Sequence, residues 1–170
     1  MKIQKIIDLC KKSGMLYIIK ANGVQWVCNG FATYPLVGLP EFTPETLCET
    51  FGVSEDAQSK MILNTKTSEE FREIEFTDLK GDEEPAEILK IGISYGGEQL
   101  IPLKCDGGIY FIKRKYLSPF KEDVELWKRR TGANEYFVIT KGMLTAGIVL
   151  PETGFKPQLA GELRDLVKML

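Results

Sequence analysis

Asp82, Glu83 and Glu84 form the densest group of carboxylates in the sequence. Carboxylate oxygens bind Mg²⁺ and Ca²⁺ in proteins, and nucleases use such ions to polarise a phosphate. The group is followed by Pro85, and its composition is typical of a solvated loop, which does not hold ligands in a fixed geometry. We therefore interpret residues 81–86 as an acidic loop and expect neither a metal site nor a cofactor.

The sequence contains no histidine. It therefore lacks the usual general base at neutral pH and the commonest metal ligand. The four cysteines lie 18, 20 and 57 residues apart, so no pair has the spacing of a zinc knuckle or of a redox Cys-x-x-Cys motif. We interpret them as buried thiols in a reducing compartment. Ser-His-Asp and Cys-His chemistry are excluded, and we expect a protein that is not an enzyme.

Basic residues are unevenly distributed, which the net charge of −2 conceals. Residues 1–40 contain five lysines and one aspartate, and residues 104–130 contain eight basic and four acidic residues. If these regions share one side of the fold, they form a positive surface that can meet phosphates; otherwise they are ordinary solvated faces. The predicted phosphate contacts are Lys2, Lys5, Lys12, Lys113, Arg114, Lys115, Lys128, Arg129 and Arg130.

Residues 41–87 have the opposite character, with fourteen acidic and four basic residues. A surface of this charge suits a protein that binds a basic partner in the manner of a DNA mimic. Neutralising Glu69, Glu70 and Glu73 would test such binding. The alternative is a solvated region that contributes only solubility.

The bulk composition is typical of a globular domain. The chain has 170 residues, of which 44% are hydrophobic and 27% charged, and this predicts a single domain over residues 1–170. No apolar run is long enough to cross a membrane, and Lys5, Asp8 and Lys11 interrupt the apolar residues near the N-terminus. We expect a cytoplasmic location and no membrane partner.

Apolar spacing predicts the elements of the first half. Ile3, Ile6, Ile7 and Cys10 define one face of a helix that Gly14 ends. Residues 68–80 fit neither the helical nor the strand period, so both stay open there. The other elements predicted are a hairpin at 15–28 that turns at Asn22-Gly23, a strand at 31–36, a helix entered through Thr43-Pro44 and ended by Gly52, and a strand at 60–67.

The second half is predicted to contain strands and two helices. One helix covers residues 118–130, with Ser118 as N-cap and Pro119 in its first turn. Its apolar stripe consists of Phe120, Val124 and Trp127, and its last turn carries Lys128, Arg129 and Arg130. The final helix, at 158–170, buries Leu159, Leu163, Leu166, Val167 and Leu170. The strands are 87–95, 98–105, 109–117 and a hairpin over 135–150, with turns at Gly96-Gly97, Asp106-Gly107-Gly108 and Lys141-Gly142.

Both halves therefore combine strands, a hairpin and a helix entered through Thr-Pro or Ser-Pro. We predict an α+β fold of antiparallel sheets with helices on one face. The two similar lobes are residues 1–80 and 87–170, joined by the acidic loop 81–86.

The stretch GGIYFIKRKYLSPF, followed by EYFVIT and AGIVLP, resembles the end of the bacterial DNA sliding clamp, the β subunit of DNA polymerase III. Tyr116-Leu117 occupy the helix start of that family's pattern, and Val149-Leu150-Pro151 stand where its closing motif lies. The resemblance covers residues 107–151. It implies a DNA-clamp-like fold in which basic helices line the DNA, and a ring built from so short a chain implies a homo-oligomer.

Small uncharacterised phage and prophage proteins are also similar to residues 26–40 and to the closing hairpin. The residues and the resemblance together predict a non-enzymatic, phage- or prophage-derived clamp-like module that binds DNA or a replication protein. The alternative function is an acidic protein-binding module of the DNA-mimic type, which engages a host or phage protein.

Overall fold

The computed structural model describes residues 1–105, 108–121, 123–154 and 157–169. The α-helices are α1 (Ile3–Ser13), α2 (Pro44–Thr50), α3 (Glu55–Gln58) and α4 (Pro157–Lys168), and the 3₁₀ helices are η1 (Ser68–Phe71) and η2 (Arg114–Leu117). The strands are β1 (Met15–Ala21), β2 (Val24–Cys28), β3 (Ala32–Pro35), β4 (Ile62–Thr67), β5 (Glu84–Ile88), β6 (Ile93–Tyr95), β7 (Glu98–Cys105), β8 (Gly108–Lys113), β9 (Glu125–Thr131), β10 (Asn134–Lys141) and β11 (Leu144–Val149).

Most strands join one large sheet with the order β4-β1-β2-β3-β11-β10-β9-β5-β7-β6, and β8 pairs with β7. The pairings are antiparallel except for the parallel pairing of β1 with β4. The α+β class is therefore confirmed, with a large sheet and few helices. No helix among the described residues is long and apolar enough to cross a membrane.

Local sequence signals account for the first elements. Gly14 adopts a left-handed φ of 70° and ends α1, as its lack of a Cβ allows. Asn22 and Gly23 have φ values of 50° and 73° and turn the β1–β2 hairpin. The Thr43 side chain accepts a hydrogen bond from the Thr46 amide and caps α2. These predictions, and those of β3 and β4, are confirmed.

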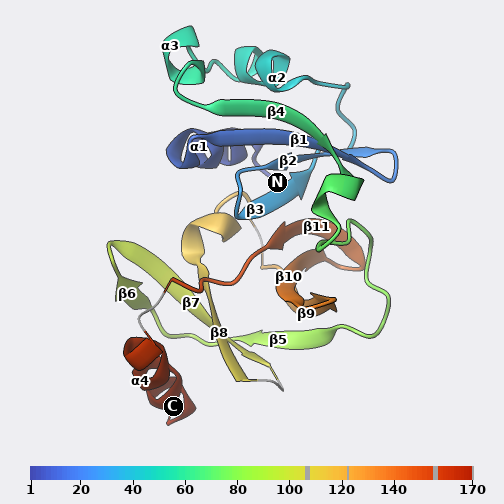
Figure 1. Cartoon of the computed structure of the whole chain (residues 1–170). Coiled ribbons are helices and arrows are strands. Elements are labelled where there is room, and N and C mark those ends of the chain that lie inside the picture. Colours follow the sequence, from blue (N-terminus) through green and yellow to red (C-terminus); the bar gives the residue numbers. More distant parts are fainter. Residues whose placement is uncertain (106–107, 122, 155–156, 170) are drawn as a thin grey trace.

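The strands of the two halves meet where β3 pairs with β11. In Figure 1, β1–β4 with α1–α3 occupy the upper part, and β5–β10 with α4 occupy the lower part. The hydroxyl of Tyr34 donates to the carbonyl of Tyr116 over 2.7 Å, and the Lys2 amide donates to the Pro119 carbonyl over 2.7 Å. Backbone pairing and buried side chains thus connect the two parts.

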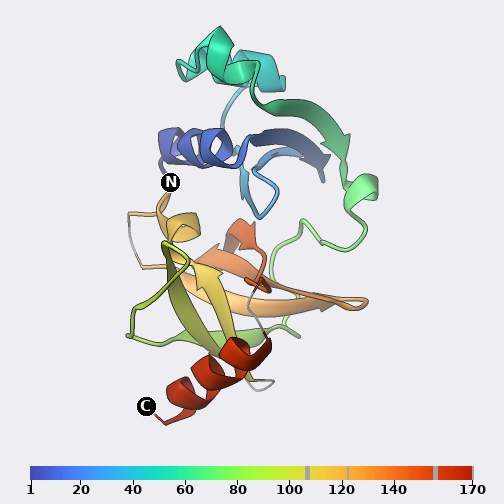
Figure 2. The same cartoon turned by 60° about the vertical axis from the view of Figure 1, so that its left-hand side comes forward.

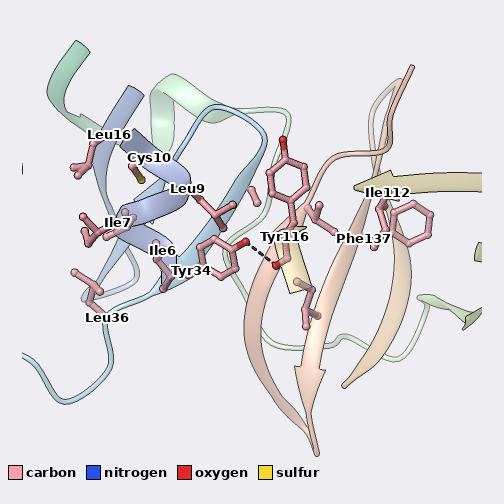
Figure 3. Close-up of a cluster of buried hydrophobic side chains, with 14 of the residues drawn as sticks. Ile6, Ile7, Leu9, Cys10, Leu16, Tyr34, Leu36, Ile112, Tyr116 and Phe137 are labelled. Carbon is pink, nitrogen blue, oxygen red and sulfur yellow. Dashed lines mark hydrogen bonds between the residues drawn. The ribbon is translucent and has the colours of Figure 1, made fainter. Parts of the chain in front are cut away.

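A hydrophobic core fills the junction on one face of the sheet. Figure 3 shows Ile6, Leu9 and Cys10 of α1 near Tyr34, with Tyr116 on the other side of the dashed hydrogen bond. A second cluster covers the opposite face and includes Ile19, Trp26, Cys28, Phe76, Tyr136 and Ile148. The four cysteines are free and buried, as expected, and burial raises the pKa of the Cys10, Cys28 and Cys48 thiols.

The helix predicted over residues 118–130 is wrong. The 3₁₀ helix η2 precedes this range, and the later residues form β9 between β10 and β5. Leu126 and Lys128 point to one face of the sheet, whereas Trp127 and Arg129 point to the other. The helical spacing of the apolar residues led to a wrong prediction because both faces of β9 are covered. A strand covered on both faces lacks the alternation of apolar and polar residues by which a strand is recognised in a sequence. The second half therefore lacks the helix that was predicted to match the Thr43-Pro44 helix of the first half.

The acidic loop predicted at residues 81–86 is also wrong in part. Glu84 begins β5, which pairs with both β9 and β7. The Glu83 side chain is only 1% exposed, and it forms an ion pair with Arg129 that compensates its buried charge. These two carboxylates are therefore parts of the sheet and its packing. Residues 68–80, left open between helix and strand, form the short η1 followed by turns and irregular chain.

The final helix α4 is confirmed, and Figure 2 shows it at the end of the molecule opposite α2 and α3. Leu163 packs against a small cluster of Leu100, Ile109 and Phe111. Leu166, predicted to be buried, is 53% exposed. The side chains of Leu159, Val167 and Leu170 lie outside the described residues, as does part of the turn predicted at Asp106-Gly107-Gly108.

Candidate functional site

The predicted basic contacts Lys128 and Arg129 are inside the protein. The side chain of Lys128 is 7% exposed, and its Nζ lies 2.7 Å from Glu84 Oε2. The Arg129 side chain is 4% exposed and pairs with Glu83. Their positions in a covered strand, instead of the last turn of an exposed helix, remove both cations from the surface.

Arg129 holds an irregular segment of the chain against the sheet. Its Nη1 donates to the carbonyls of Glu75 and Thr77, each over 3.1 Å, and its Nη2 donates to the carbonyl of Asp78 over 2.9 Å. Its Nε donates to Glu83 Oε1 over 2.8 Å. The planar guanidinium thus satisfies three backbone carbonyls and a carboxylate at once.

Glu83 completes this arrangement. Its carboxylate also accepts the backbone N–H groups of Lys80, at 2.9 Å, and Gly81, at 2.9 Å. Burial alone would raise the pKa of Glu83, but these N–H groups and the Arg129 guanidinium outweigh it and lower the pKa to about 2. Glu83 therefore stays charged across the physiological range, and its ion pair with Arg129 fixes residues 75–83 in place.

Two further predicted contacts are also paired. Lys113 Nζ lies 2.9 Å from Glu152, and Lys115 pairs with Glu98. The predicted cations that are exposed without an ion pair among the described residues are Lys2 at the N-cap of α1, Lys5 and Lys12 within α1, Arg114 of η2 and Arg130 of β9. The bond from the Lys2 amide to Pro119 places the start of α1 beside the segment that follows η2.

A cleft lies between the irregular segment 69–76 and the second face of the sheet. Its volume is about 680 Å³, within the range of roughly 300–1,000 Å³ that is typical of ligand sites. Strands β1, β2, β3, β10 and β11 contribute to its walls. The apolar lining includes Ile19, Cys28, Phe76, Tyr136, Ile148 and Leu150.

The outer wall of the cleft is held at both ends. The Tyr136 hydroxyl accepts the Glu75 amide over 2.9 Å, and the Asn22 side chain donates to the Phe76 carbonyl over 2.9 Å. At the other end, Glu70 accepts the backbone N–H of Thr67 over 2.8 Å, which is the first cause of its lowered pKa. Together with Arg129, these bonds preform the cleft.

Charged residues around the cleft are mostly acidic. Its lining contains four carboxylates and one guanidinium, those of Glu69, Glu70, Glu73, Glu135 and Arg72. Glu70 pairs with Lys66, and Glu135 accepts the Tyr110 hydroxyl over 3.0 Å. Glu69 and Glu73 are exposed and have no ion pair among the described residues. The rim is thus able to attract a cation.

Thr33 adds a buried polar group to the cleft. It lines the cleft and is 3% exposed, and its Oγ1 has no hydrogen-bond partner among the described residues. Thr33 is opposite both Cys28 and Ile148 in the sheet, so its side chain lies on their face, which is the face of the cleft. The Thr33 side chain therefore lies on the cleft face of the sheet, with its hydroxyl enclosed by the surrounding residues.

Sequence reasoning identified Glu69, Glu70 and Glu73 but missed Thr33 and Arg129 in their present roles. Thr33 lies in a predicted strand, and only its cross-strand neighbours reveal which face it occupies. No group of three His, Cys, Asp or Glu side chains in the described part of the chain is arranged to hold a metal ion.

Comparison with protein-family models, curated proteins and solved structures gives no match for this chain. The sliding-clamp resemblance of residues 107–151 accordingly stays a prediction. The function must be inferred from the residues and the cleft themselves.

Proposed function

We propose that the protein is a non-enzymatic binding module that holds a basic segment of a partner protein in the cleft. The observation that carries this proposal is an apolar cleft of about 680 Å³ whose rim bears four carboxylates and one guanidinium. Apolar walls favour desolvated side chains, and the unpaired Glu69 and Glu73 favour Lys or Arg beside them. This function corresponds to the acidic protein-binding alternative, now restricted to a defined site.

A random peptide display library panned on the purified protein at low salt tests the proposal. We expect enrichment of peptides that combine apolar residues with Lys or Arg. Affinities of synthetic copies are then measured by fluorescence anisotropy. The double variant Glu69→Gln/Glu73→Gln should weaken binding by roughly 5- to 10-fold, because two exposed charge interactions are lost.

The matched control is Glu45→Gln/Glu49→Gln, which removes the same charge from exposed positions of α2. This control should bind the selected peptides like the unmodified protein. Failure to enrich basic peptides, or equal weakening by both double variants, would contradict binding at the cleft.

DNA binding by a clamp-like module is a second candidate function. It is favoured by the exposed lysines of α1, whose first turn is tied to the segment after Arg114 through the Lys2–Pro119 hydrogen bond. In this candidate, the clamp-like architecture, the homo-oligomeric ring and the replication-protein partner remain proposals. Lys128 and Arg129 take no part in it.

Anisotropy of a labelled DNA duplex at ~50 mM salt, where counterion release makes binding strongest, tests this candidate. Replacing Lys2, Lys5 and Lys12 by Gln should lower the affinity and the salt dependence, whereas Lys90→Gln/Lys104→Gln, at exposed sites elsewhere, should do so less. Absence of binding at this salt concentration would eliminate DNA as the ligand.

A further inference from the structure

The sheet opens between β5 and β9. Their backbone pairing ends at Ala86 and Leu126, and the next residues of β5, Glu87 and Ile88, pair with β7 instead. Strand β9 continues to pair with β10 as far as Glu125. Beyond Ala86, the side of β5 that faces β9 therefore has no neighbouring strand among the described residues.

A groove occupies this opening. Its larger hollow has a volume of about 610 Å³, within the range of roughly 300–1,000 Å³ that is typical of ligand sites. Ile88 and Val124 also line a smaller hollow of about 350 Å³, so the two hollows form one β5–β9 groove. The apolar walls of the larger hollow include Leu89, Ile91, Leu117 and Phe120. No described residue lines both this groove and the cleft of the proposed function, so the two sites are separate.

One wall of the groove is a length of backbone. Residues 88–92 line it consecutively, so the chain itself borders the hollow, and not only one row of its side chains. The backbone groups of Lys90 and Ile91 have no hydrogen bond to the backbone of the described residues. Unpaired backbone beside an apolar surface is a site at which an extended segment of another chain can add as a strand.

The charges of the larger hollow favour an acidic ligand. Its lining carries two cations, Lys90 and Arg114, and one carboxylate, that of Asp123. All three side chains are exposed and have no ion pair among the described residues. Glu125 lines the smaller hollow instead. An acidic side chain of a ligand therefore belongs at the end of the groove that carries Lys90 and Arg114.

We infer that the β5–β9 groove binds an extended segment of a partner protein that combines apolar residues with Asp or Glu. The segment adds to the side of residues 88–91 that faces the groove, its apolar side chains fill the hollows, and its carboxylate meets Lys90 and Arg114. A fatty acid shares the apolar and acidic character, but it has no N–H groups to pair with the backbone. The backbone wall therefore favours a peptide.

The probe is a capped, fluorescently labelled octapeptide in which valine alternates with glutamate, and its comparison alternates valine with lysine. Fluorescence anisotropy should show tighter binding of the glutamate peptide. Lys90→Gln/Arg114→Gln should weaken this binding by roughly 5-fold, because two exposed charge interactions are lost. Lys11→Gln/Lys104→Gln, which removes the same charge from exposed positions outside the groove, should weaken it less.

Two further variants separate binding from folding. Asp123→Asn removes the opposing charge and should strengthen binding of the glutamate peptide by about 2-fold, a gain that loss of folding cannot produce. Gly92 lines the groove, and a Cβ there meets nothing within 4 Å. Gly92→Trp should therefore obstruct the groove and abolish binding without lowering the thermal midpoint.

N-methylation of the glutamate peptide tests strand addition, because it removes N–H donors and keeps the side chains. Methylation of alternate amides on one edge of the peptide should abolish binding, and methylation on the other edge should preserve it. Equal binding of the two methylated peptides would overturn the inference, as would equal affinity for glutamate and lysine peptides or absence of binding to either.

Other occupants of the groove give different results. Binding of dodecanoate that depends on Lys90 and Arg114, without binding of the peptide, would assign the groove to a fatty acid. A dimer in sedimentation equilibrium that Gly92→Trp dissociates would assign it to a second copy of this chain. Either result would overturn the inference. The cleft takes no part in these measurements, so the failure of one proposal leaves the other standing.

Discussion

Arg129 has the sequence context of a surface cation, but in the structure it is buried and stabilises the interior. Its guanidinium bonds to the carbonyls of Glu75, Thr77 and Asp78 and to the Glu83 carboxylate. Lysine could supply the charge but not the planar set of donors. Removing either member of a buried pair leaves an uncompensated charge, so the pair depends on both residues.

Stability in acid should depend on Glu83. Its pKa in the folded protein is about 2, against a usual value of 4.5. Because the folded pKa is the lower one, the contribution to stability is complete above about pH 4.5 and is lost as the pH falls towards 2. One pKa unit corresponds to about 1.4 kcal/mol, so the loss should be on the order of 3 kcal/mol. Urea unfolding between about pH 5 and pH 2 measures it.

The variant Glu83→Gln should be less stable near neutral pH and should lose less stability in acid than the unmodified protein. Glu87→Gln, at an exposed site of β5, should preserve the acid dependence. A Glu83→Gln variant with the unmodified acid dependence would show that another carboxylate is responsible.

The β3–β11 pairing is the element on which the junction of the two parts depends. Gly147 lies at this pairing, and a Cβ there would be 3.2 Å from the Thr33 carbonyl oxygen, 3.2 Å from Tyr34 Cδ1 and 3.3 Å from Ile139 Cδ1. Gly147→Ala should therefore lower the free energy of unfolding by about 1–3 kcal/mol, through crowding of backbone and buried side chains. Urea denaturation measures the change.

Gly92→Ala is the matched control, because a Cβ at Gly92 meets nothing within 4 Å and its φ is not in the left-handed range. Alanine there should leave the free energy of unfolding unchanged or raise it by up to about 1 kcal/mol, because it reduces the conformational entropy of the unfolded chain. Equal stability of the two variants would mean that the sheet can open at β11 without strain.

Elements with strong local signals could be predicted from the sequence. The α1 face, the Asn22-Gly23 turn and the Thr43 cap depend on neighbouring residues, and each was confirmed. The helix prediction for residues 118–130 failed because long-range contacts determine their conformation. These contacts are the pairing with β10 and the ion pairs with carboxylates distant in sequence. In the sequence, Lys128 and Arg129 resemble part of a basic surface. Only the structure shows that they are buried beside Glu84 and Glu83.

The whole molecule should unfold in one step, because one sheet and the hydrophobic clusters on both of its faces connect its two parts. The two tryptophans allow a direct measurement, since Trp26 lies in β2 and Trp127 in β9. The variants Trp127→Phe and Trp26→Phe each leave a single fluorescent reporter, in the first and second part respectively. Each variant should give the same denaturant midpoint by fluorescence and by circular dichroism.

A reporter whose fluorescence transition differs from the circular dichroism transition of the same variant would show that the parts unfold separately. Comparison within one variant is needed because each substitution alters stability by itself. Tyr34→Phe, which removes the hydrogen bond to Tyr116, provides a variant in which such uncoupling is most readily detected.

The candidate site could be predicted only in part, for reasons that concern the whole molecule. The acidic character of residues 69–73 is visible in the sequence. The cleft itself requires segment 69–76 to lie across strands from both halves, and no local pattern encodes that contact. The orientation of Thr33 likewise depends on strands 5 and 115 residues away, those of Cys28 and Ile148.

The position of β11 between β3 and β10 has a consequence for synthesis on the ribosome. The nascent chain presents β1, β2 and β3 early, but the partner that completes the β3 edge is made more than a hundred residues later. Until residues 144–149 leave the exit tunnel, that edge displays unpaired backbone groups, which are the groups through which nascent chains aggregate. Release of the β10–β11 hairpin from the tunnel thus completes the sheet. Chaperone occupancy on arrested nascent chains should fall at the chain length at which residues 144–149 have emerged.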